Sequence, residues 1–202
     1  MLHEMLDKGY TPNVITCNIL TSSLCKEGKL KQALRLLNVM VQIGHQPDEI
    51  TYSTLIDGFC TVGNLEKAKE LLQGMPEKGC TPNLVTYSTL INGLCKHGRI
   101  EEAQQIFSEM PKQGLSPNVV TYNTLMNGLC KVGNLKEAIK LFQHMKDISL
   151  VPDVFTYNTL MDGLSKEGTL QEANKLLDGL DGLRREGTMA HSKSPMKNGV
   201  KC

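Results

Sequence analysis

Apolar residues recur along this chain at the spacing of amphipathic helices, and the whole pattern repeats every 35 residues. In one copy the first apolar stripe, with the i, i+3, i+4, i+7, i+8 spacing of a half-buried helix, comprises Tyr87, Leu90, Ile91, Leu94 and Cys95. The second stripe of the same copy comprises Ile100, Ala103, Ile106, Phe107 and Met110. Each copy therefore predicts two helices.

Aligning the sequence with itself at this offset divides it into repeats. The repeats span 14–48, 49–83, 84–118 and 119–153, and a degenerate fifth one spans 154–183. We expect 1–13 to be the end of a truncated repeat and 184–202 to be a disordered tail. Because one helical pair cannot bury its own apolar stripe, neighbouring pairs must stack. The sequence thus predicts an all-α solenoid of 35-residue helix-turn-helix repeats.

Polar and small residues mark the ends of these helices. A threonine stands before each first stripe, where we expect it to N-cap the helix: Thr16, Thr51, Thr86, Thr121 and Thr156. A glycine follows each first helix and should end it: Gly28, Gly63, Gly98, Gly133 and Gly168. Two second helices open with a capping box, Asn134 to Glu137 and Thr169 to Glu172. Alanine recurs where paired helices should approach closely, at 33, 68, 103, 138 and 173.

Composition narrows the range of functions. The 22 basic and 21 acidic residues give a net charge of +1, which excludes a strongly basic, nonspecific nucleic-acid coat. No apolar run is long enough to span a bilayer, so no membrane partner is expected. The 7 cysteines are odd in number and form no C-x-x-C pair, which indicates free thiols in a reducing compartment. The first residues lack the character of a transit peptide.

No residue pattern favours catalysis or a metal. Four cysteines recur at the repeat period, Cys25, Cys60, Cys95 and Cys130, but they fall in the first-helix stripe and are expected to be core residues rather than ligands. Methionines 40, 75, 110 and 145 are likewise expected in the core of the second helices. The histidines share no metal-like spacing, and no phosphate loop or nucleophile motif occurs. We therefore expect no enzyme, cofactor, metal or small-molecule substrate.

The strings VTYNTLMNGLCKVGNLKEA (120–138) and VTYSTLINGLCKHGRIEEA (85–103) resemble the pentatricopeptide repeat family, in particular its plant P class near the restorer-of-fertility type. The resemblance covers residues 1 to about 180. It implies a right-handed solenoid that binds single-stranded RNA, one base per repeat. It also implies a mitochondrial or chloroplast protein that acts in RNA processing, stability or translation, with protein cofactors as further partners.

The same resemblance implies which residues read bases, namely the fifth and the last of each repeat. Those pairs are Asn18 with Asp48, Ser53 with Asn83, Ser88 with Asn118, and Asn123 with Asp153. By the family's code Asn with Asp favours uracil and Ser with Asn favours adenine, so the implied site is 5'-UAAU-3'. Asn158 would begin a fifth pair, but its partner position holds Thr188. Both positions of a pair should face an open groove, so replacing Asn123 by Ser and Asp153 by Asn should scarcely alter the stability of the chain.

Two further sets follow from the resemblance. The second residue of each repeat should sandwich a base: Ile15, Ile50, Val85, Val120 and Phe155. A lysine near the end of each first helix should contact phosphate: Lys26, Lys96, Lys131 and Lys166. The second repeat departs from this pattern with Thr61, which should weaken its contact with the RNA backbone.

Three alternatives to an RNA reader stay open. A protein-binding solenoid would be expected to carry charged or apolar anchors in its groove, whereas this groove repeats small amide, hydroxyl and carboxylate groups. An endonuclease or deaminase would need a C-terminal domain, for which the segment from Arg184 onward is too short. A nonfunctional fragment of a longer reader is the third, suggested by the mid-repeat start and the degenerate fifth repeat.

Overall fold

The computed structural model describes residues 12–167, which contain nine α-helices and two short 3-10 turns. The helices come in pairs along the chain: α2 (Val14–Lys26) with α3 (Leu30–Gln42), α4 (Glu49–Thr61) with α5 (Leu65–Gly74), α6 (Leu84–Lys96) with α7 (Ile100–Glu109), and α8 (Val119–Lys131) with α9 (Leu135–Asp147), followed by α10 (Val154–Glu167). The 3-10 turns η1 (Pro76–Lys78) and η2 (Pro111–Gln113) follow α5 and α7. The predicted repeat remnant up to 11, the signals at 168–173 and the predicted tail lie outside the described residues.

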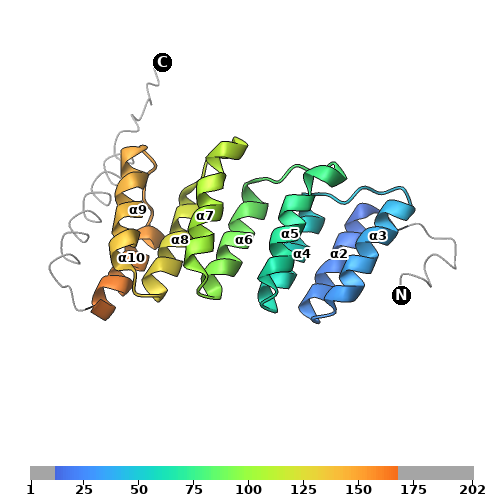
Figure 1. The fold of residues 1–202 in the computed structure, drawn as a ribbon, viewed down its shortest axis with the longest axis horizontal. Helices are drawn as coiled ribbons and strands as arrows, with labels where there is room; N and C mark the ends of the chain where they lie inside the picture. The colour runs from blue at the N-terminus through green and yellow to red at the C-terminus, as the bar shows by residue number, and fades with distance from the viewer. Residues whose placement is uncertain (1–11, 168–202) are drawn as a thin grey trace, which may run out of the picture.

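The pairs follow one another along the long axis of the molecule, from α2 and α3 at one end to α9 and α10 at the other (Figure 1). The first helices α2, α4, α6, α8 and α10 pack side by side in chain order. Each second helix contacts the first helix of its own repeat and that of the next one. This is the predicted all-α solenoid, in which the first helices form one continuous layer.

The residue that caps each first helix differs from the prediction. Thr51 and Thr86 are the third residues of their helices, and the N-caps are Asp48 and Asn83. The Asp48 carboxylate accepts the Thr51 backbone N–H at 2.8 Å, and the Asn83 amide oxygen accepts the Thr86 N–H at 3.1 Å. The prediction that threonine is the N-cap was wrong, because the preceding Asn or Asp has the extended backbone and short acceptor side chain that a cap needs.

The helix ends agree with the sequence pattern. Glycines 28, 63, 98 and 133 follow the first helices with φ between 70° and 78°, the left-handed conformation that closes a helix. Asn134 accepts the Glu137 backbone N–H at 3.4 Å, which is one half of the predicted capping box. These signals fix where the chain turns back, and with that the register of each pair.

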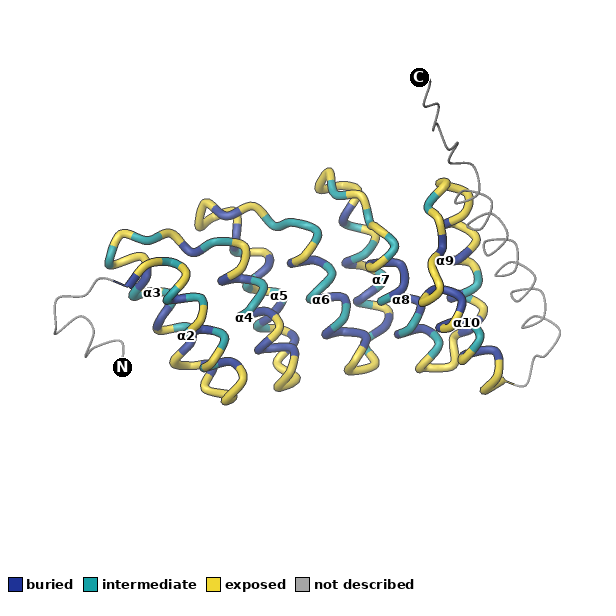
Figure 2. Tube along the Cα trace, turned by 180° about the vertical axis from the view of Figure 1, so that it is seen from behind, coloured by how far each residue is buried: buried dark blue, intermediate teal, exposed yellow. Residues whose placement is uncertain are grey.

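The predicted stripes form the core. All the residues of the two stripes predicted for 84–118 are buried except Phe107, which is half-buried and packs edge-on against Tyr122 with ring centroids 5.0 Å apart. Alanines 33, 68, 103 and 138 and methionines 40, 75, 110 and 145 are also buried, as predicted. Buried positions recur along every helix (Figure 2). Residues 27–29, 62–64 and 132–134, in turns within helix pairs, are exposed, whereas the links between repeats include the buried Pro47 and Cys80.

A glycine in the middle of each later first helix lets the preceding first helix approach closely. A Cβ added to Gly93 would lie 2.2 Å from the Cys60 sulfur, and one added to Gly128 would lie 2.5 Å from that of Cys95. The equivalent distances are 2.8 Å for Gly58 with Cys25 and 2.9 Å for Gly163 with Cys130. We call each contact between adjacent first helices a joint. The recurring cysteines thus serve as small core residues at the joints.

Candidate nucleic-acid interface

A row of exposed apolar side chains follows the first helices. It consists of the second residue of each, Ile15, Ile50, Val85, Val120 and Phe155, which are between 57% and 69% exposed. Because the helices pack side by side in the same register, these residues recur at the same height on one face. They are the residues predicted to sandwich bases, and their exposure leaves them accessible to a flat ligand.

The pair at the joint of α2 and α4 forms a closed polar cluster. Asn18 Nδ2 donates to both carboxylate oxygens of Asp48, at 3.0 and 3.2 Å. The Thr51 hydroxyl lies 2.5 Å from Asn18 Oδ1 and 2.8 Å from Asp48 Oδ1. The two predicted base-reading residues are therefore in contact, and a third residue, which was predicted only as a cap, joins them.

The joint of α8 and α10 repeats this cluster. Asn123 Nδ2 donates to Asp153 Oδ1 at 3.0 Å, and the Thr156 hydroxyl lies 2.7 Å from Asn123 Oδ1. Asn123 is only 4% exposed, although both positions were expected to face an open groove. That expectation was wrong for this residue, because the cluster draws its amide into the joint beside the buried Thr156. Asp153 stays exposed.

Both aspartates of these clusters are held as carboxylates. Burial raises the pKa of Asp48, but hydrogen bonds from the Thr51 backbone and hydroxyl and from the Asn18 amide outweigh burial, so the net pKa is lowered. The same balance, with Thr156 and Asn123 as donors, lowers the pKa of Asp153. Each cluster therefore carries a negative charge and acceptor oxygens at neutral pH.

The serine pairs are arranged differently. At the joint of α4 and α6, Ser53 donates to the Glu49 carbonyl of its own helix at 2.6 Å, while the Asn83 amide oxygen only caps α6. At the joint of α6 and α8, the Ser88 hydroxyl lies 3.1 Å from that of Thr121, which donates to Asn118 Oδ1 at 3.0 Å. Neither serine contacts its partner residue directly among the described hydrogen bonds. Asn158 is exposed, and its partner position lies outside the described residues.

One hollow brings two of the predicted sets together. It has a volume of about 420 Å³ at the joint of α6 and α8, and its lining includes Val85, Val120, Ser88, Asn118 and Asp57. Two predicted sandwich residues and one predicted base-reading pair therefore border the same open space. Asp57 adds a carboxylate that the sequence analysis did not single out.

The lysines predicted to contact phosphate differ in whether a carboxylate already neutralises them. Lys26, Lys96 and Lys131 are exposed, and no carboxylate of residues 12–167 forms an ion pair with them. Lys166 instead pairs with Asp162 at 2.7 Å. Thr61, which replaces lysine in the second repeat, is exposed. Three lysines thus offer free positive charge, and one is partly neutralised.

The cysteines offer little chemistry at neutral pH. Burial, reinforced by nearby Asp57, raises the pKa of the Cys60 thiol to about 12, and burial raises the pKa of Cys95 to about 11. Within residues 12–167 no group of three histidine, cysteine or acidic side chains is placed to hold a metal ion. None of the described helices is both long and apolar enough to cross a membrane.

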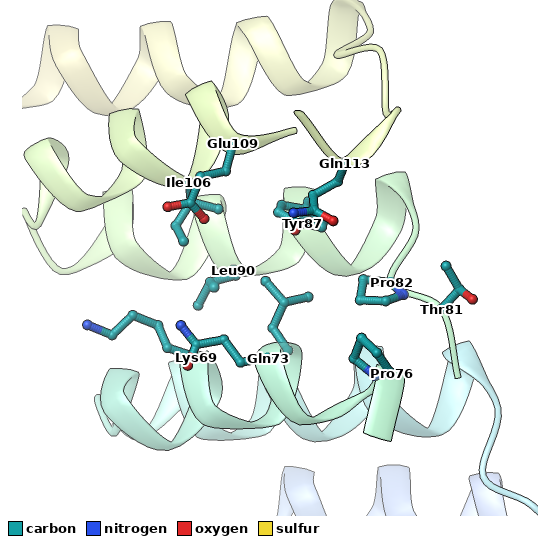
Figure 3. Close-up of a pocket in the computed structure, with 11 residues that line it drawn as sticks. Lys69, Gln73, Pro76, Thr81, Pro82, Tyr87, Leu90, Ile106, Glu109 and Gln113 are labelled. Atoms are coloured by element: carbon teal, nitrogen blue, oxygen red, sulfur yellow. The ribbon is translucent and has the colours of Figure 1, made fainter. Parts of the chain in front are cut away.

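A second kind of hollow lies at the level of the second helices. Between α5 and α7 it measures about 480 Å³, with Pro76, Pro82, Tyr87 and Gln113 among its lining (Figure 3). A related hollow of about 600 Å³ at the preceding repeat is lined in part by Pro47 and Tyr52. None of the residues predicted to contact RNA lines either hollow. They are features of the solenoid rather than of the predicted interface.

Comparison of the sequence with family models identifies repeats along the described chain. The model of the PPR repeat family matches residues 12–61, 54–96, 85–131 and 117–166, and a model of the PPR repeat matches 155–182. A comparison with curated protein sequences finds no significant match.

Solved structures with the same fold include RNA complexes. The pentatricopeptide repeat protein PPR10 from maize is 29% identical with a TM-score of 0.75, and the match covers 94% of this chain and 27% of that one. PPR10 in complex with an 18-nt psaJ RNA element matches at 29% identity and a TM-score of 0.76, covering 92% and 27%. The PPR domain of Arabidopsis thaliana PRORP1 in complex with tRNA is 20% identical, with a TM-score of 0.63 and coverage of 86% and 95%, which shows a common fold alone. The chain spans about a quarter of PPR10.

Proposed function

We propose, because this chain belongs to the PPR repeat family, that it binds single-stranded RNA and reads one base per repeat. The observation that carries the proposal is the hollow at the joint of α6 and α8, where exposed Val85 and Val120 border the same space as Ser88 and Asn118. Apolar side chains give affinity for the flat faces of any base, and polar groups beside them give choice. PPR10, which shares the fold, is bound to RNA in one of its structures, and this supports the same ligand class.

The chemistry of the pairs supports different bases at the two kinds of joint. Asn123 uses one amide hydrogen on Asp153 and keeps another, while the hydrogen bonds from Asn123 and Thr156 to the Asp153 carboxylate end on Oδ1. A donor beside an acceptor matches uracil, which presents a carbonyl beside an N–H. At Ser88 and Asn118, the free amide NH₂ can donate to adenine N1 while the hydroxyl accepts from its amino group. The proposed core site is 5'-UAAU-3'.

The wider role follows the family. We infer a P-class protein of the restorer-of-fertility type that acts in a mitochondrion or chloroplast by occupying its RNA in processing, stability or translation, without catalysis. Four base contacts, each contributing about 1 to 3 kcal/mol, must offset the ordering of a flexible strand. Binding by this chain alone should therefore be weak, with a Kd of about a micromolar or higher.

The test converts the fourth repeat to the chemistry of the third. A chain with Asn123→Ser and Asp153→Asn should change from uracil to adenine preference at the fourth base, a shift of roughly tenfold in relative Kd. Labelled 5'-UAAU-3' oligomers are displaced at low ionic strength by competitors that vary only that base. Asn38→Ser makes the first of these two changes on the exposed side of α3 and should leave the preference unaltered. A preference that stays with uracil, or loss of binding without a switch, would overturn the assignment of this pair as base readers. A parent chain that binds none of the oligomers would favour a protein-binding scaffold instead.

A further inference from the structure

The third residue of α4, α6, α8 and α10 is a buried threonine, and its hydroxyl has different partners at different joints. We propose that Thr51 and Thr156 are specificity-positioning residues, which orient the base-reading amides of Asn18 and Asn123 from the following repeat. The inference rests on the proposed RNA-binding function and deepens it. Under this proposal each uracil-binding site is a triad of asparagine, aspartate and threonine, in which the threonine belongs to the following repeat.

The geometry of the triad is the same at both ends of the described chain. Thr51 Oγ1 lies 2.5 Å from Asn18 Oδ1, and Thr156 Oγ1 lies 2.7 Å from Asn123 Oδ1. Each threonine is fully buried, and its backbone N–H is held by the capping aspartate at 2.8 Å. The hydroxyl is thus fixed in place by the start of the helix and lies against the amide oxygen of the neighbouring repeat.

The aspartate carboxylate and the threonine hydroxyl together decide which end of the amide a ligand meets. An amide can rotate by half a turn and exchange its oxygen with its NH₂ group. In the observed orientation the NH₂ group donates to aspartate while the oxygen faces the threonine hydroxyl. The reverse orientation would set the amide oxygen against the carboxylate and would bring the NH₂ group onto a hydroxyl oxygen that already accepts the Asp48 backbone N–H at 3.3 Å. Threonine and aspartate together therefore keep an N–H available, which suits the uracil O4 carbonyl and opposes the amino group of cytosine.

The chain contains its own matched comparison. Thr86 is equally buried and also stands third in its helix, but its hydroxyl donates to the Asn83 carbonyl at 2.8 Å. Ser53 of the preceding repeat donates to Glu49 instead and has no hydrogen bond to Thr86. A serine hydroxyl has no amide to orient. Thr86 thus supports the helix start alone, whereas Thr51 supports both the helix start and the amide.

The experiment uses the whole chain and two measurements. In the RNA-free chain, NMR of the side-chain amide should find the Asn18 NH₂ group exchanging slowly in the parent and in Thr51→Ser, and faster in Thr51→Val. In competition binding, the preference for 5'-UAAU-3' over 5'-CAAU-3' should fall about fivefold in Thr51→Val, as expected for one lost hydrogen bond, and should be retained in Thr51→Ser. Thr86→Val should lose stability but keep its preference for adenine at the second base.

The outcomes separate the two proposals. If Thr51→Val binds RNA with an unchanged preference for uracil over cytosine, the positioning role is overturned and RNA binding stands. If the parent chain binds none of the oligomers, the proposed function fails and the specificity role fails with it, whatever the amide exchange. Should Thr51→Val not fold, Thr156→Val at the opposite end is measured against 5'-UAAC-3' with the same expectation.

Discussion

The joints of this solenoid are of two kinds, and they differ in what holds adjacent repeats together. At the Asn–Asp joints, α2 with α4 and α8 with α10, the polar pair is hydrogen bonded across the joint. At the Ser–Asn joints, α4 with α6 and α6 with α8, no such direct bond exists, but the helices come closer at the glycine. A Cβ added to the glycine would lie 2.2 or 2.5 Å from the facing cysteine sulfur at the Ser–Asn joints, against 2.8 or 2.9 Å at the Asn–Asp joints.

This difference teaches that the residues proposed to choose a base also contribute to how repeats pack. Asparagine and aspartate are hydrogen bonded to each other across the joint, whereas Ser53 bonds only within its own helix and Ser88 reaches the Thr121 hydroxyl rather than its partner Asn118. Changing the proposed base code should therefore change stability as well. The Asn123→Ser and Asp153→Asn exchange, expected from the sequence to be neutral, should cost about 1 kcal/mol because a hydrogen bond across the joint is lost.

The largest effect is expected at the closest contact. Gly93→Ala should destabilise the chain by about 3 kcal/mol, and Gly58→Ala by about 1 kcal/mol, because overpacking costs more where the neighbour has less room to move. The gain in helix propensity from glycine to alanine is the same at both sites and cancels in the comparison. Urea unfolding followed by circular dichroism measures both free energies.

A second variant identifies the cause of that loss. Cys60→Gly together with Gly93→Ala moves the glycine to the other side of the joint and removes the atoms that the new Cβ would meet. It should recover part of the loss. Equal losses for Gly93→Ala and Gly58→Ala would contradict the idea that the two kinds of joint differ in closeness.

The next effect concerns the polar link. Asp48→Ala removes a helix cap and leaves the Asn18 amide without its acceptor, so it should cost about 2 kcal/mol, whereas Asn83→Ala removes a cap alone and should cost about 1 kcal/mol. Double-mutant cycles sharpen the test. Asn18→Ala with Asp48→Ala should show a coupling of about 1 kcal/mol, and Ser53→Ala with Asn83→Ala a coupling of about zero. Similar couplings at the two joints would remove the distinction between them.

Much of this architecture could be predicted from the sequence because it repeats. The apolar stripes, the glycines after the first helices and the burial of Cys25, Cys60 and Cys95 follow from local periodicity, and the structure confirms them. The fourth recurring cysteine, Cys130, is half-buried. The threonine cap was wrong because capping depends on backbone conformation at the residue after proline, which the stripe does not reveal. The spacing of an Asn or Asp three residues before each threonine was the available signal.

Contacts between repeats were harder to predict. The burial of Asn123 and its link to Thr156 join residues 33 positions apart, a separation at which composition and spacing give no orientation. The same holds for Asp57, which borders the hollow of the following joint. The position within the repeat was enough to identify the proposed base-reading residues. Whether their side chains are hydrogen bonded to one another depends on how two adjacent helices pack.

The smallest effect is the response to pH, which should separate the two kinds of joint again. Hydrogen bonds from threonine and asparagine outweigh burial and lower the pKa of Asp48 and Asp153 in the folded chain, whereas the Ser–Asn pairs carry no titrating group. A lowered folded-state pKa contributes stability that is present above the ordinary value of 3.8 and is lost as the pH falls through the folded value. A chain with Asp48→Asn and Asp153→Asn keeps cap residues of the kind seen at Asn83 but cannot titrate there. Thermal unfolding of both chains from neutral pH downward should show the parent's advantage shrinking below a pH of about 4, while the other carboxylates cancel because both chains share them. If the difference in thermal stability between the parent and the variant stays constant down to acid-induced unfolding, the charge of these two aspartates does not stabilise the contact between repeats.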